Sequence, residues 1–451
     1  MLHGVLAFFN IIIAQIKINI HYICKKMKMY MKRRESLKIL GSIPFLSLGG
    51  INFVEAKQIE RSRQAFAASP KNIILVLADG MGVAQWQAGA IGNGGSLNVG
   101  RMTHTGLLTT NPLDNFCGDA PSHCTALACG INSHKGAVGV DKDDKPVKNI
   151  IEMAKEAGIA TGIVSSNTLV EGSNVPFIGH SKNRMMTDEI TAQYVDTGVD
   201  VFIGAGESFF TNSVKGFGPP IGAGNPGAGA PNGAGQGRPQ GQGGPGQGGP
   251  GAGGPQMTFE PRADKRDLLG ELKQKGYHIL HSWEEIKQVK SGKVAGFTDK
   301  VQIPNLENGR DPNMYPDEVS LALSLLSQNP KGFFLMTSSM FVDRASHNGK
   351  TDLLIKEAIN LDMAIGRALD FADKRDDTLV IVAGSPEASG MTLVGGDIQN
   401  RTVEAKWTMP GMANHSGIMV PYFAYGAGAG QFGGTMLNTE LFEQMKSLLK
   451  L

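Results

Sequence analysis

Three residues of the sequence have the types and spacing of a metal-binding group. Asp343 and His347 are four residues apart in "DRASH", so on a helix their side chains share one face. His415 stands in the loop "ANHSG", shortly before an apolar run that is typical of a strand. One carboxylate and two imidazoles suit a zinc ion whose fourth coordination position stays open. The sequence therefore predicts a zinc site at these three residues.

Asp79 is a further candidate ligand. It lies at the end of the apolar run in "NIILVLADGMG", which is typical of a buried parallel strand. The side chain that follows such a strand lies at the carboxyl edge of the sheet, where α/β proteins bind ligands. An aspartate at this position can also cap the helix that follows, so the residues alone leave both roles open.

Apolar runs that predict strands alternate with segments that predict helices along the body of the chain. This alternation predicts an α/β fold with a central, mostly parallel sheet and helices on both faces. The predicted strands are "NIILVLA", "ATGIVSS", "VDVFIGAG", "GFFLMTSS", "TLVIVAGS" and "VPYFAYG", and the predicted helices are "VKNIIEMAKEAG", "RDLLGELKQKG", "PDEVSLALSLLSQ" and "LLIKEAINLDMAIGRALDFADK".

Two segments stand apart from this body. Residues 216–256 are more than half Gly and Pro without a strict triplet period, which predicts a disordered surface insertion. Residues 1–67 read as a presequence, in which Arg33, Arg34 and the apolar run after them resemble a twin-arginine export signal. The apolar stretch within residues 1–30 indicates either a start codon placed too early or a membrane anchor. We therefore expect one domain at 68–451, exported to the periplasm or beyond the cell.

The charge distribution argues against a nucleic-acid partner. The chain has a formal net charge of +2, but residues 1–67 hold 11 Lys and Arg against 3 acidic residues. The remaining body is therefore mildly acidic, and an acidic body does not attract the phosphates of nucleic acids.

The chain resembles the alkaline phosphatase family from about Lys71 to the C-terminus, apart from the Gly-rich insertion. The resemblance implies the alkaline-phosphatase-like sandwich, in which helices cover both faces of a mostly parallel sheet. It also implies phosphomonoester hydrolysis by a serine at a helix N-terminus, with two zinc ions, one magnesium ion and a phosphate-binding arginine. The motifs that carry it are "NIILVLADGMG", "TALACGINSHKGAVGVD", "GFFLM", "DTLVIV" and "HSGIMVPYFAYGAGA".

Part of that machinery is retained. By resemblance, Asp343, His347 and His415 match the ligands of the zinc ion that activates water. Arg184 in "HSKNR" matches the arginine that holds the phosphate oxygens, although by its type alone it reads equally as a surface charge. Asp79 matches the carboxylate that bridges the second zinc ion and the magnesium ion.

The magnesium region is altered. Glu171 and Ser173 in "VEGSN" stand where the family has an acid or imidazole and a threonine, so they are weak metal candidates. Ser338 in "MTSSM" takes the place of the family's magnesium-binding glutamate. The sequence therefore predicts one bound zinc ion and leaves magnesium doubtful.

The nucleophile and the second zinc site are missing. Ala120 in "GDAPSHC" occupies the position of the family's serine, and Ser385 and Pro386 replace its Asp-His pair of zinc ligands. The loss of the serine and the loss of the second zinc site are consistent with each other, because a zinc ion that activates a serine has no function without that serine. Three neighbours are weak substitutes: Ser122 and Cys124 as nucleophiles, and His123 as a ligand or base against the alternative of a packing or surface residue.

Two functions remain open from the sequence. The first is a phosphomonoester hydrolase with degenerate machinery, in which water at the remaining zinc ion attacks the ester. The second is an inactive relative that binds a phosphate-like anion or a protein partner through Arg184 and one zinc ion. A homodimer is a further expectation.

Overall fold

The computed structural model describes residues 69–216, 257–410 and 414–451, all within one compact unit that spans Arg61–Leu451. The predicted presequence and residues 217–256 of the predicted insertion lie outside the described residues. Within the described residues, no helix combines the length and the apolar character needed to cross a membrane.

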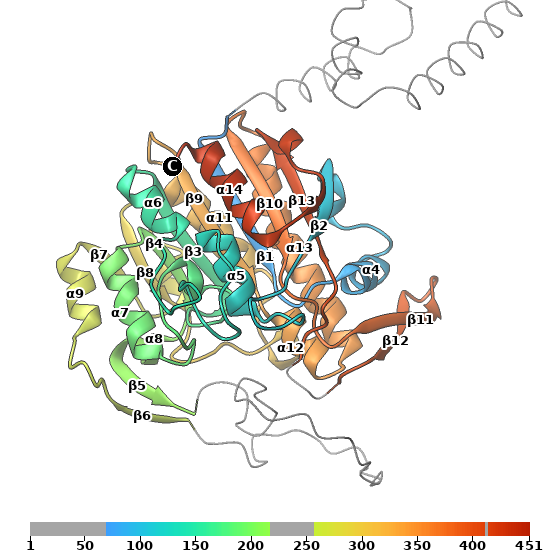
Figure 1. Cartoon of the computed structure of the whole chain (residues 1–451), viewed down its shortest axis with the longest axis horizontal. Coiled ribbons are helices and arrows are strands. Elements are labelled where there is room, and N and C mark those ends of the chain that lie inside the picture. The colour runs from blue at the N-terminus through green and yellow to red at the C-terminus, as the bar shows by residue number, and fades with distance from the viewer. Residues whose placement is uncertain (1–68, 217–256, 411–413) are drawn as a thin grey trace, which may run out of the picture. The chain divides into compact units, whose positions relative to one another are not determined.

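A ten-stranded sheet forms the centre of this unit, in the order β14-β2-β13-β10-β1-β9-β3-β4-β8-β7 (Figure 1). The strands from β10 to β7 in this order are parallel to one another. The predicted α/β class with a mostly parallel sheet is thus confirmed. The strands are β1 (Asn72–Ala78), β2 (His104–Leu108), β3 (Ala160–Thr168), β4 (Val201–Ala205), β7 (Tyr277–Leu280), β8 (Lys293–Phe297), β9 (Phe333–Ser339), β10 (Thr378–Gly384), β13 (Val420–Gly426) and β14 (Gly434–Met436).

Helices cover both faces of the sheet, and each face has its own apolar core. Side chains of β1 alternate between the cores, with Ile73 and Leu75 in one and Ile74 and Val76 in the other. The first core includes residues of α5 (Ala120–Cys129), α6 (Ile150–Glu156), α7 (Thr187–Thr197), α9 (Leu268–Gln274) and α14 (Asn438–Leu449). The second includes residues of α4 (Val83–Gly92), α10 (Trp283–Ile286), α11 (Met314–Leu326), α12 (Phe341–His347) and α13 (Thr351–Ala372).

Strand β13 runs opposite to its neighbour β10, with Ala383 opposite Tyr422. The start of β13 therefore lies at the edge of the sheet where β10 and β1 end. This direction brings the loop before β13, which carries His415, to the edge where a parallel sheet presents its ligands. A backbone bridge between Ala388 and His415 joins this loop to the segment that follows β10.

Two hairpins lie outside the central sheet. One consists of β11 (Met391–Asp397) and β12 (Thr402–Trp407), and the other of β5 (Asn212–Lys215) and β6 (Thr258–Pro261). The short helix α8 (Glu207–Thr211) leads directly into β5.

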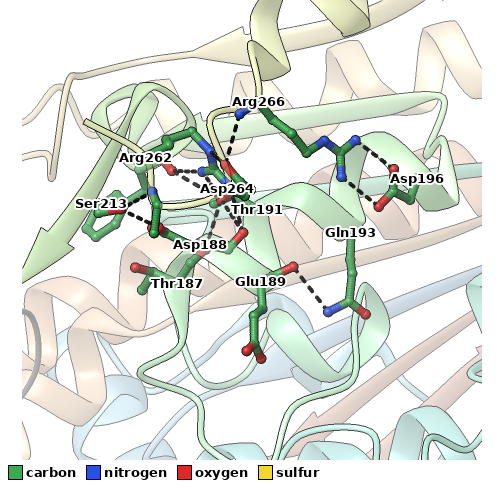
Figure 2. Close-up of polar contacts among 12 residues, drawn as sticks. Thr187, Asp188, Glu189, Thr191, Gln193, Asp196, Ser213, Arg262, Asp264 and Arg266 are labelled. Carbon is green, nitrogen blue, oxygen red and sulfur yellow. Dashed lines mark hydrogen bonds and ion pairs between the residues drawn. The ribbon is translucent and has the colours of Figure 1, made fainter. Parts of the chain in front are cut away.

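Arg262, directly after β6, anchors the second hairpin to α7 (Figure 2). Its buried guanidinium donates to the hydroxyl of Thr191 at 2.9 Å and to the backbone carbonyl of Asp188 at 2.8 Å. Hydrogen bonds from a charged donor are among the stronger ones in proteins. Because α7 begins three residues after Arg184, this network also fixes the end of the loop that carries Arg184.

Candidate functional site

The predicted zinc ligands converge at one point of the structure. Asp343 and His347 project from α12, which follows β9, and His415 comes from the loop before β13. Oδ1 of Asp343 lies 3.2 Å from Nε2 of His347 and 3.1 Å from Nε2 of His415. The three side chains are 10% to 15% exposed, so the group is largely buried but still open to solvent.

This arrangement fits a zinc ion. Bonds of about 2.0 Å to a tetrahedral ion place neighbouring ligand atoms about 3.3 Å apart, close to the two spacings at Asp343. Among the described residues, this is the one group of three or more His, Cys, Asp or Glu side chains whose ligand atoms all lie within 4.8 Å of one another. Although burial opposes ionisation, His347 and His415 hold the pKa of Asp343 well below its ordinary value, so it is a carboxylate.

Asp79 lies beside this group and has an unused oxygen. A Cβ on Gly80 would come 2.5 Å from Cα of Asp343, so the loop after β1 touches α12. Asp79 is 4% exposed, and its Oδ1 has no hydrogen-bond partner in the described part of the chain. Burial, and next the charge of Asp343, raises the pKa of Asp79 to about 7. The N-cap of α4 is Gly82, so Asp79 does not cap that helix.

The place of a second zinc ion beside Asp79 lacks further ligands. Ser385 follows β10 as Asp79 follows β1, and its backbone N–H donates to the carbonyl of Ala78 at 3.0 Å. Pro386 has no donor atom, and its Cγ lies 3.2 Å from the position of a Cβ on Gly118, near the start of α5. One carboxylate and one neutral hydroxyl do not fit a zinc site, which takes three or four nitrogen, oxygen or sulfur ligands from the protein.

The residues at the place of the family's magnesium site do not fit a metal ion either. Glu171 Oε1 pairs with Arg344 at 3.0 Å, and Oγ of Ser338 donates to Oδ1 of Asn174 at 2.5 Å. Ser173 has a fully buried hydroxyl without a partner among the described residues. Magnesium demands octahedral oxygen coordination, and Glu171 and Ser338 are turned to other partners.

Ala120 is the first residue of α5, and Arg184 reaches this end of the helix. A Cβ on Gly172 would lie 2.7 Å from Nη1 of Arg184 and 3.5 Å from Cβ of Ala120. Glycine at 172 thus allows a guanidinium and the start of a helix to approach each other. Pro121 has no N–H, and the N–H of Ser122 donates to Oδ1 of Asp119 at 3.1 Å, so among the first three residues of α5 Ala120 is the one that can offer its N–H to an anion. This N–H and the planar fork of Arg184 together favour an anion such as phosphate.

None of the three candidates near Ala120 offers a replacement nucleophile or base. Ser122 is 1% exposed and its hydroxyl donates to Oδ1 of Asp119 at 2.5 Å. Cys124 is fully buried, and burial raises the pKa of its thiol well above the ordinary value, so it is not a thiolate. His123 is also fully buried: its Nε2 lies 3.2 Å from the carbonyl of Gly384, and burial lowers its pKa to about 4.

The structure adds two residues that the sequence reasoning missed. Arg344 on α12 holds Glu171 and also donates to Gln302 at 2.8 Å. Ser389, in the segment after β10, has its hydroxyl 3.1 Å from Nδ1 of His347. The one feature of the sequence that could have indicated Arg344 is its position directly after Asp343. No feature of the sequence indicates Ser389.

Comparisons with known proteins show which family the chain is similar to. The family model described as "Alkaline phosphatase" matches residues 70–216 and 252–413. Alkaline phosphatase 4 of Bacillus subtilis (strain 168) is 26% identical over 387 residues, which cover 82% of this chain and 73% of that protein. Alkaline phosphatase of Escherichia coli (strain K12) is 27% identical over 452 residues, which cover 89% of this chain and 91% of that protein.

A solved structure agrees with the sequence matches. The alkaline phosphatase from the Antarctic bacterium TAB5 superimposes with a TM-score of 0.69 at 26% sequence identity, covering 85% of this chain and 98% of that one. The match extends over nearly the whole of that enzyme, so the resemblance is one of complete folds. The resemblance predicted from the motifs is confirmed, and the chain belongs to the alkaline phosphatase family.

Proposed function

We propose that this protein binds phosphate monoesters between Arg184 and the start of α5, and hydrolyses them slowly by direct attack of water. Membership of the alkaline phosphatase family supports a phosphomonoester substrate. The observation that carries the proposal is that Arg184 and Ala120 both lie next to Gly172, which supports an anion site where the family's attacking residue is absent. Asp343, His347 and His415 are the residues that would hold one zinc ion beside it.

The absent serine changes the course of hydrolysis. A zinc ion supplies positive charge and Lewis acidity when it is bound. Without a nucleophilic side chain, the oxygen of water bonds to phosphorus while the bond to the ester oxygen breaks, and a proton passes to the leaving alcohol. This is one displacement without a covalent enzyme intermediate. Loss of a positioned nucleophile and of one metal site costs about 4 kcal/mol of transition-state stabilisation or more, which lowers the rate about a thousandfold.

Turnover of a chromogenic phosphate monoester by the purified protein tests this proposal. We expect slow hydrolysis that requires zinc and is lost in His415→Ala, because that variant removes one of three ligands. Alcohol and inorganic phosphate should appear in equal amounts even in Tris buffer, since no phosphorylated enzyme exists to transfer phosphate to an amino alcohol. Hydrolysis no faster than in a chelated control would exclude the hydrolase.

A second candidate is a protein that binds phosphate esters or a partner without turnover. The burial of Cys124 and the engagement of Ser122 with Asp119 favour it, because both leave the lost nucleophile without a substitute. This candidate needs the fold, Arg184 and one zinc ion, and no catalytic step.

Phosphate binding separates either candidate from a purely structural role. At a phosphate concentration of about 100 Kd, binding to one site adds about 2.7 kcal/mol to the free energy of unfolding, which raises the melting temperature by several degrees. We expect Arg184→Ala to abolish this rise and Arg184→Lys to reduce it, because lysine lacks the bidentate fork. Lys182→Ala, an exposed change in the same loop, serves as the control and should keep the rise. An equal rise in Arg184→Ala and the wild type would show that the anion binds elsewhere.

A further inference from the structure

Ser389 has an unusual backbone conformation for a buried residue. Its φ is +64°, in the left-handed region that favours glycine, and its side chain is fully buried. The other described non-glycine residues with positive φ are all exposed: Asp144, Lys265, Arg401 and Lys450. A non-glycine residue held in this region is strained, and such strain gathers at functional sites.

The contacts of Ser389 explain this conformation, because they reach the imidazole of His347 and the backbone of the loop that carries His415. Its hydroxyl oxygen lies 3.1 Å from Nδ1 of His347. Its backbone N–H donates to the carbonyl of Asn414 at 3.1 Å, directly before His415. The preceding residue, Ala388, forms the backbone bridge with His415. One strained residue thus joins α12 to the loop before β13.

We propose that Ser389 is a positioning residue that orients His347 and the His415 loop for the metal ion. The inference rests on the zinc site of the proposed function. The Ser389 hydroxyl can accept a hydrogen bond from Nδ1–H of the neutral imidazole, and in that state Nε2 is the nitrogen that binds a metal ion. Nε2 is the atom that faces Asp343, so the hydrogen bond at Nδ1 holds the ring in the orientation that a metal requires.

The carboxylate of Glu387 holds the turn that carries Ser389. Its oxygens accept the backbone N–H groups of Gly390 at 3.1 Å and Met391 at 3.0 Å, and the hydroxyl of Ser416 at 2.5 Å. Glu387 is 1% exposed, so these bonds are shielded from water. Ser416 follows His415, and the carboxylate therefore ties the same two segments together as Ser389 does.

Substitutions at Ser389 separate the hydroxyl from the backbone strain. Ser389→Ala and Ser389→Gly both remove the hydroxyl, and we expect each to weaken zinc binding about tenfold or more, measured by competition with a chromophoric chelator. Glycine adopts positive φ without strain, so Ser389→Gly should keep or raise the melting temperature of the metal-free protein. Ser389→Asn tolerates the left-handed backbone, supplies a polar group, and should bind zinc more tightly than Ser389→Gly.

A merely structural role predicts a different pattern, in which zinc affinity follows the stability of the metal-free protein. Ser346→Ala is the matched control, because this buried hydroxyl on α12 donates to the carbonyl of Val342 at 2.8 Å and not to a ligand; its zinc affinity should stay within about threefold of wild type. The visible spectrum of bound Co²⁺ should change in Ser389→Gly and not in Ser346→Ala. Wild-type zinc affinity in Ser389→Gly, or no gain in Ser389→Asn over Ser389→Gly, overturns this role of Ser389. A wild-type protein that binds no zinc overturns the proposed metal site itself.

Discussion

Ala120→Ser alone leaves the turnover of phosphate monoesters within about threefold of the wild-type rate. The new hydroxyl stands at the first position of α5, close to Arg184, but a serine hydroxyl is a weak nucleophile without an adjacent base or metal ion. The place of the second zinc ion keeps one carboxylate, that of Asp79, and Ser385 and Pro386 supply no zinc ligand. Steady-state kinetics with a chromogenic ester at saturating zinc measures the effect.

The combination Ala120→Ser, Ser385→Asp and Pro386→His should raise turnover at least about a hundredfold, or about 2.7 kcal/mol of transition-state stabilisation. It restores the acid and imidazole at the carboxyl end of β10, next to Asp79, together with the serine. Zinc content should rise from one to two ions per chain. Ser385→Asp with Pro386→His is the matched control, and we expect it to bind the second ion without a gain in rate. A large gain from Ala120→Ser alone would contradict our account of the lost site.

Local sequence patterns were sufficient to predict which three residues the structure brings together as a candidate metal group. The side chain after an apolar strand, as at Asp79, and a pair four residues apart on a helix, as at Asp343 and His347, have positions set by strand and helix geometry. His415 was predicted because it precedes an apolar strand. The reversed direction of that strand was not predicted, because an apolar run reads alike in parallel and antiparallel strands.

The supporting residues depend on contacts between segments far apart in the sequence. Ser389 contacts His347, which is 42 residues away in the sequence, and Arg344 contacts Glu171, which is 173 residues away. No periodicity or motif in the sequence encodes such pairs, and serine at positive φ goes against the usual preference for glycine there. The same limit applies to Gly172. The sequence does not show that a glycine is required there, because the requirement comes from the approach of Arg184 and Ala120 to this position.

Asp79→Asn should stabilise the metal-free protein at pH 8 and have little effect near pH 4. Burial and the charge of Asp343 raise the pKa of Asp79 from 3.8 to about 7. Between these values the folded chain keeps a proton that the unfolded chain releases, so the free energy of unfolding falls as pH rises. The loss reaches up to about 4 kcal/mol above pH 7, at about 1.4 kcal/mol per pH unit. Asparagine has no proton to release, so the free energy of unfolding of Asp79→Asn does not fall in this way as pH rises.

Asp343→Asn provides the matched control, because its effect has the opposite sign. Despite burial, the pKa of Asp343 is held well below its ordinary value by His347 and His415, so its carboxylate stabilises the fold above about pH 4 and loses this contribution on acidification. Thermal melts in the presence of a chelator, from pH 4 to pH 8, should therefore show Asp79→Asn above the wild type and Asp343→Asn below it at pH 8. If Asp79→Asn shifts the melting temperature equally at both ends of this range, the carboxyl of Asp79 is ionised throughout. The cleft then does not hold one aspartate with a raised pKa beside one with a lowered pKa.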